Sequence, residues 1–214
     1  MVVLDSVDST NNYAMQQARS GLAQNGSAYL AMEQTAGKGQ RGRNWLASAG
    51  ENLLLSTVLS PSILELNSPV GLSFAVALAC YDLVKMYLGE EDCSIKWPND
   101  LYWQDRKAGG ILIESIWTAG ALDPAMQETQ GFWTWAIVGT GLNLNQREFP
   151  GLGKQAVSFL QVTGKKNDPL QACKQLLGLL EIRLEELREL GFEALLDAYN
   201  EALYLKNKEV EFLS

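Results

Sequence analysis

The sequence predicts an α+β fold in which helices pack on a mixed, mainly antiparallel sheet. Strand-like segments and a charged hairpin alternate irregularly with helices, and the two strongest helical patterns stand apart at residues 68–88 and 168–190. This order differs from the regular strand–helix repeat that builds a parallel sheet. A chain of 214 residues, 47% of them hydrophobic, is long enough to bury the core of one sizeable domain.

A helix and two strands are expected at the N-terminal end of the chain. Ser9 or Thr10 can cap a helix that runs to about Ser20, and Gly21 ends it. The segment SAYLAMEQ at 27–34 has the character of a strand that leads into a glycine-rich loop. The segment ENLLLSTVLS at 51–60 predicts a second, apolar strand.

The middle of the chain is expected to hold a buried helix and a hairpin. Ser68 is an N-cap followed by proline at the first helical position, and the apolar run from Val70 to Leu88 extends this helix. The segments SIKWPNDLYW at 94–103 and AGGILIESIW at 108–117 flank the polar turn QDRK, which is typical of a β-hairpin. Residues 118–131 are polar and small, so we expect a flexible loop there.

The C-terminal part is expected to contain one strand and two helices. The segment FWTWAIVGTGLNLN at 132–145 predicts a strand that ends in a second glycine loop. Asp168 and Pro169 begin a helix with a clear 3.6-residue apolar period, Gly191 breaks it, and a shorter helix follows to about Leu205. Residues 206–214 have the pattern of the first strand of a further unit that does not continue.

Composition excludes several classes of protein. The net charge of −8 and the pI near 4.7 disfavour a broad nucleic-acid-binding face. No apolar run reaches the ~18 residues of a membrane span, and the N-terminus lacks the pattern of a signal peptide. The three cysteines are widely spaced and odd in number, so we expect them to be reduced, buried and structural, which fits the cytoplasm.

The complete absence of histidine limits the chemistry further. It excludes Ser-His-Asp and Cys-His nucleophiles, HExxH metal sites and histidine general bases. Together with the scattered cysteines it leaves no zinc site, and no haem or flavin is expected. Chemistry must therefore come from lysine, arginine, carboxylates, backbone amides or a hard metal such as Mg²⁺.

The loop TAGKGQRGRNW at 35–45 concentrates positive charge on an acidic chain. It fails as a Walker P-loop, and GTGLNLN at 139–145 fails as a dinucleotide fingerprint because Leu144 stands at the third glycine position. Glycines at three positions would still let backbone amides form an anion nest, with added charge from lysine and arginine. A solvent-exposed basic turn is the alternative. The residues concerned are Gly37, Gly39, Gly42, Lys38, Arg41 and Arg43.

A second cluster consists of KWPND at 96–100 and DRKAGG at 105–110. Lys107 stands at the hairpin, where it can meet a carboxylate or a phosphate as a point charge. The two glycines that follow would let the strand pack against a flat group. Asn99 and Asp100 could hold Mg²⁺ through oxygen, or they could simply form a turn. A charged hairpin turn without a ligand is again the alternative.

In this order, STNNY, GKGQRGRNW, KWPNDLYW, DRKAGGILIE and VGTGLNLN resemble the biotin–protein ligases over about residues 9–145, with a looser similarity to about 205. The resemblance implies a class II aminoacyl-tRNA synthetase-like catalytic domain. It also implies that biotin is activated by ATP as biotinyl-5′-AMP and transferred to a lysine of the biotin carboxyl carrier protein domain of acetyl-CoA carboxylase. The expected domains are a catalytic unit at 1–205 and the start of a small C-terminal β-barrel domain, apparently truncated, at 206–214.

The resemblance also assigns a role to each motif residue. Biotin ureido contacts fall to Ser9, Thr10, Asn11 and Gln34, the closing loop to Gly37, Lys38, Gly39 and Gln40, and the biotin tail to Gly109 and Gly110. Lys107 would meet the biotin carboxylate and the α-phosphate, and Arg43 the ATP phosphates, so these two are the catalytic candidates. Nucleotide contacts would come from Arg41, Arg43, Asn99, Asp100 and Asn143, with Trp45 packing behind the loop and Asp100 as the Mg²⁺ ligand.

Three departures from the family pattern qualify this resemblance. Gln40 stands where an arginine is usual, which predicts weaker retention of biotinyl-AMP. The pattern begins at Ser9, so this is expected to be a short form without the DNA-binding module or a transcriptional role. The apparently truncated C-terminal domain puts nucleotide affinity in doubt. A lipoate–protein ligase and a non-catalytic biotin-binding module are the alternatives; a homodimer is possible, and neither membrane nor nucleic-acid binding is expected.

Overall fold

The computed structural model describes residues 1–66, 69–123 and 128–208, and within them one seven-stranded sheet in the order β1-β2-β3-β7-β6-β5-β4. β1 and β2 are parallel, and every other neighbouring pair is antiparallel, which confirms the predicted mixed, mainly antiparallel sheet. The strands are β1 Val2–Val7, β2 Ser27–Gln34, β3 Leu53–Leu59, β4 Cys93–Lys96, β5 Asp100–Trp103, β6 Arg106–Asp123 and β7 Glu128–Leu142.

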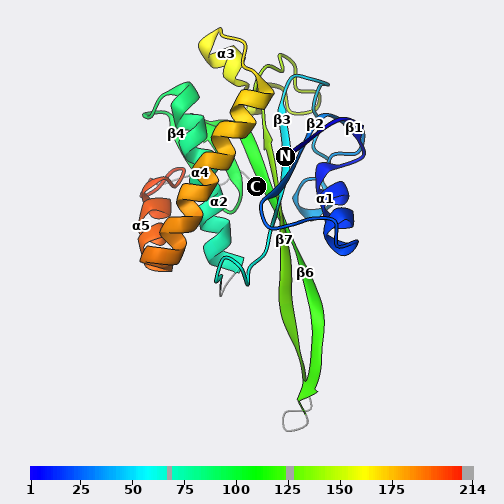
Figure 1. Cartoon of the computed structure of the whole chain (residues 1–214). Helices are drawn as coiled ribbons and strands as arrows, with labels where there is room; N and C mark the ends of the chain where they lie inside the picture. The colour runs from blue at the N-terminus through cyan, green and yellow to red at the C-terminus, as the bar shows by residue number, and fades with distance from the viewer. Residues whose placement is uncertain (67–68, 124–127, 209–214) are drawn as a thin grey trace.

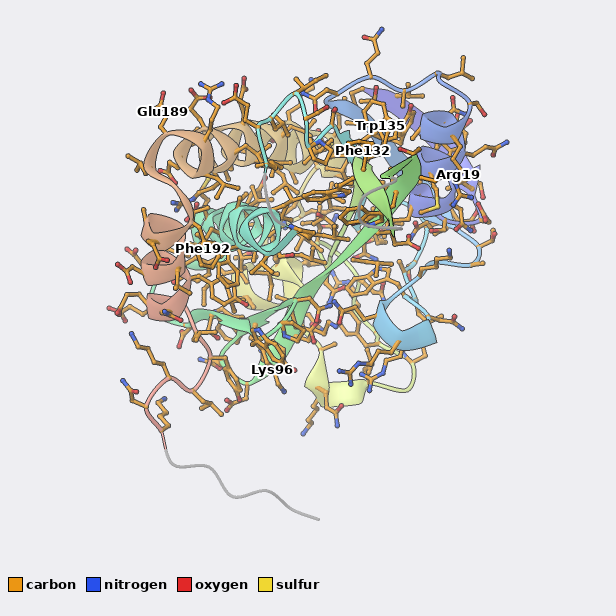
Figure 2. All side chains as sticks on the ribbon, turned by 90° about the horizontal axis from the view of Figure 1, so that it is seen from below. Arg19, Lys96, Phe132, Trp135, Glu189 and Phe192 are labelled. Carbon is orange, nitrogen blue, oxygen red and sulfur yellow. The ribbon has the colours of Figure 1, made fainter. Side chains whose placement is uncertain are left out.

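Helices cover both faces of this sheet (Figures 1 and 2). One face packs against α1, and the other packs against α2 and α4, where the larger hydrophobic core lies, with α5 packed on these two helices. A smaller core lies on the opposite face, between the sheet and α1. The helices are α1 Thr10–Arg19, α2 Pro69–Leu88, α3 Phe159–Thr163, α4 Pro169–Leu190 and α5 Phe192–Glu201.

The helix α2 lies at the centre of the larger core. Its buried residues occur all around the helix, because the sheet, α4 and α5 surround it. This helix is long and apolar enough to cross a membrane by length and composition alone, although Asp82 and Lys85 interrupt its apolar run. Burial within the fold accounts for that apolar character.

The boundaries of α4 follow the predicted signals. The side chain of Asp168 accepts a hydrogen bond from the backbone N–H of Leu170 at 2.9 Å, and proline occupies the first turn. Gly191 has a φ of 80°, which favours glycine, and it separates α4 from α5. Phe74 of α2 then stacks on both Phe192 and Tyr199 of α5, with ring centroids 5.3 and 4.3 Å apart.

Two strand assignments differ from the prediction. No strand was expected before Ser9, but β1 pairs with β2 as an exposed edge strand whose weak alternation hid it. The predicted strand at 94–103 is two strands, β4 and β5, separated by a turn with a cis Trp97–Pro98 peptide bond. The predicted hairpin around QDRK is confirmed as the β5–β6 pair.

The predicted flexible loop at 118–131 is wrong wherever the structure describes it. Strands β6 and β7 continue as a two-stranded arm that projects from the body of the molecule (Figure 1). Thr118 pairs with Phe132, and the indoles of Trp117 and Trp133 stack with their centroids 6.0 Å apart. Small, polar composition suggested a loop, whereas cross-strand contacts of this kind stabilise a hairpin.

The three cysteines are free and buried, as predicted. Burial raises the pKa of Cys80 to about 12 and the pKa values of Cys93 and Cys173 to about 11. Because the thiolate is the reactive form, we expect all three to react with Ellman's reagent at pH 8 only after denaturation. Rapid reaction of the native protein would contradict this packing.

The end of α5 packs beside β4 before the described residues stop. Leu203 forms a parallel bridge with Ile95, and Tyr204 donates from its backbone to Ile95 at 2.9 Å. Residues 206–208 form turn and coil. The remainder of the strand expected at 206–214 lies outside the described residues, so the C-terminal β-domain stays a prediction.

Candidate functional site

A pocket opens on the α1 face of the sheet, between the start of α1, the loop at 37–45 and the glycine-rich ends of β6 and β7. Its free volume is about 60 Å³. Ligand pockets usually measure about 300–1,000 Å³, so the space is largely filled by the protein's own side chains. The lining residues are Ser9, Thr10, Asn11, Gln34, Lys38, Gly39, Gln40, Trp45, Leu54, Leu55, Asn99, Lys107, Gly110, Ile111, Leu112, Gly139, Thr140 and Gly141.

The loop at 37–45 is a small hairpin over this pocket. The backbone N–H of Gly39 donates to Arg43 at 2.7 Å, and that of Trp45 donates to Gly37 at 2.8 Å. Lys38 therefore occupies a non-hydrogen-bonded position opposite Asn44. Its backbone N–H and C=O make no hydrogen bond within the described residues, which leaves a donor and an acceptor beside the pocket.

One end of the pocket is polar and neutral. Gln34 accepts from the backbone N–H of Thr10 at 2.7 Å and from its hydroxyl at 2.9 Å. This fixes the side-chain carbonyl of Gln34 and leaves its NH₂ group without a partner in the described part of the chain. Ser9 precedes α1 but does not cap it, so its buried hydroxyl is equally available.

A buried network supports this polar end. The hydroxyl of Ser56 contacts the hydroxyl of Thr10 at 2.8 Å and the carbonyl oxygen of Asn11 at 2.6 Å. The amide of Asn11 donates to Glu114 at 2.8 Å and to the Leu112 carbonyl at 3.3 Å. Both ends of Asn11 are thus used within the protein, so its geometry suits positioning better than the direct ligand contact that was expected.

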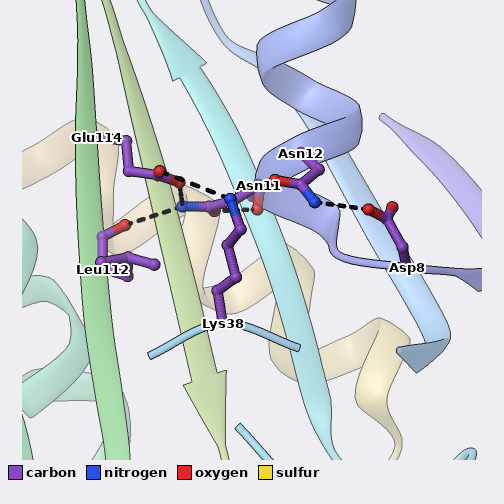
Figure 3. A network of polar contacts seen from close by, with 7 residues as sticks. Asp8, Asn11, Asn12, Lys38, Leu112 and Glu114 are labelled. Carbon is purple, nitrogen blue, oxygen red and sulfur yellow. Dashed lines mark hydrogen bonds and ion pairs between the residues drawn. The ribbon is translucent and has the colours of Figure 1, made fainter. Parts of the chain in front are cut away.

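Figure 3 shows how Glu114 of β6 links α1 to the loop at 37–45. One carboxylate oxygen accepts from Asn11 of α1, and the other lies 3.9 Å from the ammonium of Lys38 in the loop. Nearby, a hydrogen bond from Asn12 lowers the pKa of Asp8. Glu114 therefore connects the loop to the polar end of the pocket.

The other end of the pocket carries the cation Lys107. Its ammonium lies 2.6 Å from Asp100 and 5.6 Å from the ring centroid of Trp45. The backbone of Lys107 is held separately, since its carbonyl accepts from the amide of Asn143 at 3.3 Å and from the backbone N–H of Val157 at 2.9 Å. The position of this lysine thus depends on the backbone, while its charge faces the pocket.

Two glycines form the floor between these ends. A β-carbon on Gly141 would lie 2.6 Å from the indole of Trp45, and one on Gly110 would lie 3.2 Å from it. A β-carbon on Gly139 would lie 2.3 Å from the side-chain oxygen of Asn11. The flat group expected on a glycine platform is therefore present, and it is the protein's own Trp45.

Several residues expected to contact ligands do not line this pocket. Gly37 borders a neighbouring cavity, and Arg41 and Arg43 are exposed on the loop. Gly109 faces Leu142, on the side of the strand away from the pocket. Asn143 is buried behind Lys107, and Asp100, the expected Mg²⁺ ligand, is paired with Lys107 instead.

Other residues that build the site were not expected from the sequence. Ser56 and Glu114 stabilise it through hydrogen bonds, while Gly139 and Gly141 make room for Asn11 and Trp45. The GTG triplet was a usable signal for the two glycines, because alternate residues of a strand face one side. The apolar sequence around Ser56 gives no indication that this residue supports a site.

A mainly antiparallel sheet, with helices packed behind it and a pocket under a glycine loop in front, defines a class II aminoacyl-tRNA synthetase-like catalytic domain. The chain belongs to the biotin/lipoate A/B protein ligase family, whose sequence model matches residues 3–123.

Similar proteins agree with this family assignment. The chain is 31% identical to the bifunctional ligase/repressor BirA of Escherichia coli K12 over 216 residues, which is 100% of this chain and 62% of that protein. It is 40% identical to the biotin–[acetyl-CoA-carboxylase] ligase of Paracoccus denitrificans over 144 residues, 66% of this chain and 53% of that one. The chain thus spans about three fifths or less of these relatives.

A solved structure supports the fold. The biotin protein ligase from Aquifex aeolicus in complex with biotin and ATP superposes with a TM-score of 0.76 at 27% identity. The match covers 94% of this chain and 77% of that one.

Proposed function

We propose that this chain is an ATP-dependent biotin–protein ligase that forms biotinyl-5′-AMP and transfers biotin to a lysine of a carrier protein. The observation that carries the proposal is the polarity of the pocket. At one end, Ser9, Gln34 and the backbone of Lys38 offer neutral hydrogen-bonding groups without a partner in the part of the chain that the structure describes, and the ammonium of Lys107 lies at the other end.

The neutral end suits a cyclic urea. The biotin ring offers two N–H donors and one carbonyl acceptor, and the free groups of the pocket include both donors and acceptors. The dithiolane ring of lipoate offers no such groups and would leave the buried polar atoms unpaired. A site of this kind rejects the less polar analogue. This argues for biotin over lipoate, which is the alternative acid.

The cationic end suits the reacting groups. A carboxylate oxygen of biotin attacks the α-phosphorus of ATP, the bond to the β-phosphate breaks, and pyrophosphate leaves. Because two anions must approach each other, charge neutralisation by Lys107, with Arg41 and Arg43 brought in by the loop, is the main requirement. The amine of the carrier lysine then attacks the acyl carbon, releasing AMP and a proton.

Magnesium is proposed only as the counter-ion of the triphosphate. Within residues 1–66, 69–123 and 128–208 no group of three acidic or cysteine side chains could hold a metal. Mg²⁺ usually relies on one or two carboxylates and on substrate phosphates, so a cluster of three is not needed. Asp100, the carboxylate expected to contribute, is paired with Lys107 in this arrangement.

The proposed partner is the biotin carboxyl carrier domain of acetyl-CoA carboxylase, and the proposed location is the cytoplasm. The curated relative from Paracoccus carries that carboxylase in its name. A homodimer through the open edge of β6 fits the geometry, because β5 covers this strand only as far as Gly110. A non-catalytic biotin-binding module is the remaining alternative, and Lys107 argues against it.

The direct test is biotin-dependent ATP–pyrophosphate exchange by the 214-residue chain, with lipoate as the control acid. We expect exchange with biotin to exceed that with lipoate by at least about 100-fold. Exchange with lipoate alone would support the alternative acid. Biotin binding without exchange would support the binding module, and the absence of both would contradict the proposal.

Gln40 offers a second prediction. It lines the pocket at the loop tip, where an arginine would add a positive charge beside the adenylate phosphate. We expect Gln40→Arg to slow the release of biotinyl-AMP by about tenfold, equivalent to one charge-assisted contact of about 1.4 kcal/mol. Stopped-flow release from a preformed complex would measure this, and Gln40→Met would control for side-chain length. Equal release rates for both variants would refute it.

A further inference from the structure

We propose that Trp45 is a gating residue that occupies the place of the ligand's chain in the empty protein. The indole must leave the glycine floor before a long-chain acid can bind. The proposal rests on the proposed function for the identity of the acid, biotin. The gate goes beyond the proposed function, because it gives Trp45 a second position and a role in selecting ligands by the presence of a chain.

The floor of the pocket leaves no room for a chain beneath the indole. Hypothetical β-carbons on Gly110 and Gly141 would lie 3.2 and 2.6 Å from the indole, which therefore rests directly on both strands. No aliphatic chain can run between the indole and these glycines. Only about 60 Å³ remains beside the ring, so head and chain of a bicyclic acid do not fit together.

Two side chains of the protein surround the ammonium of Lys107. Asp100 places a carboxylate 2.6 Å from its ammonium, and the ring of Trp45 lies 5.6 Å from the same atom. These two side chains thus supply an anion and an apolar slab, the two features of an acid with a long chain. The carboxylate of a bound acid would take the place of Asp100 beside Lys107, and its chain would take the place of the indole.

The indole is poorly satisfied where it lies. Its Nε1 is buried and has no hydrogen-bond partner among the described residues. A buried donor without a partner is costly, so this position is held by packing and by the contact with the Lys107 ammonium, without a hydrogen bond from the indole.

A second cavity gives the indole a place to go. It shares Gln34 and Trp45 with the first pocket and has a free volume of about 280 Å³. Its other walls are the two limbs of the loop together with Gln146 and Pro150. The base of the loop is fixed, since Gln146 accepts from the backbone N–H of Ser48 at 3.0 Å and from Asn52 at 2.6 Å. Rotation of the Trp45 side chain can therefore open the floor without unfolding the loop.

The gate predicts a difference between ligands. A cyclic urea without a chain, such as 2-imidazolidone, needs only the polar end and can bind with the indole in place. Biotin must displace it. The apparent affinity for biotin is lowered by the fraction of molecules in which the floor is covered.

The test is ¹⁹F NMR of the whole chain labelled with 5-fluorotryptophan. The chain has six tryptophans, and the Trp45 resonance is the one missing from the Trp45→Phe variant. We expect biotin to shift this resonance and 2-imidazolidone to leave it unchanged. Biotin that binds, by calorimetry, without a change at Trp45 would overturn the gate and leave the proposed function intact.

Two variants complete the test. Gly141→Ala should move the Trp45 resonance in the empty protein, whereas Gly178→Ala, with nothing near its β-carbon, should not. Trp45→Ala should raise the association rate of biotin about tenfold. Binding of biotin by Trp45→Ala but not by the wild type would support the gate. An unchanged association rate would overturn the gate. Failure of both the wild type and Trp45→Ala to bind biotin would overturn the proposed function, and with it the assignment of the floor.

Discussion

Replacement of Lys107 by methionine is expected to reduce biotin-dependent pyrophosphate exchange by at least about 100-fold while leaving the protein folded. Loss of a single group that stabilises developing charge in a dry site typically costs about 10²–10³ in rate. The ammonium faces the pocket, whereas the backbone of residue 107 is held by Asn143 and Val157. The substitution therefore removes the charge without removing what positions the strand.

The controls for this prediction separate charge from geometry. Lys166→Met removes a lysine whose side chain is 74% exposed and whose ammonium lies 3.8 Å from Glu51, and we expect it to leave exchange unchanged. Lys107→Arg keeps the charge but presents a planar fork in place of a point charge, so we expect it to restore less than a tenth of the activity. Exchange by Lys107→Met within tenfold of wild type would contradict the role of this lysine.

The motif residues were predictable because their signals are local. Lys107 and Gly110 follow a recognisable turn, and their proximity to the loop follows once β5 and β6 form a hairpin. Which of the two neighbouring glycines faces the pocket was not predictable. Successive residues of a strand face opposite sides, and a register shift between Leu101 and Tyr102 sets the phase. Gly110 therefore forms the floor, and Gly109 meets Leu142.

Other features depend on contacts between distant segments. Ser56 is buried within an apolar strand, and its role appears only when α1 brings Thr10 and Asn11 beside it. The arm formed by β6 and β7 is likewise stabilised by pairing across strands, as at Trp117 and Trp133, rather than by the composition of either segment. Local propensity carries no information about such partners.

Gly139→Ala is expected to destabilise the protein and weaken biotin binding together. The added β-carbon would lie 2.3 Å from the side-chain oxygen of Asn11, which is only 3% exposed and cannot move into solvent without breaking its contacts. Loss of the hydrogen bonds to Ser56 and Glu114 leaves buried polar groups unpaired, which costs about 2–3 kcal/mol. Because Asn11 supports the polar end, we also expect biotin affinity to fall at least about tenfold.

The matched control for the effect of Gly139→Ala is the same substitution made together with Asn11→Ala, which removes the group that the new methyl would meet. In an Asn11→Ala background the added methyl group of Gly139→Ala meets open space, so the two changes should be strongly non-additive, with a coupling of at least about 1 kcal/mol. Gly178→Ala, in the interior of α4 with nothing near its β-carbon, should instead stabilise the protein by roughly 0.5–1 kcal/mol. Urea denaturation of the four proteins of the cycle measures the coupling. Additive free energies of unfolding would mean that the collision with Asn11 is not what makes glycine necessary at 139.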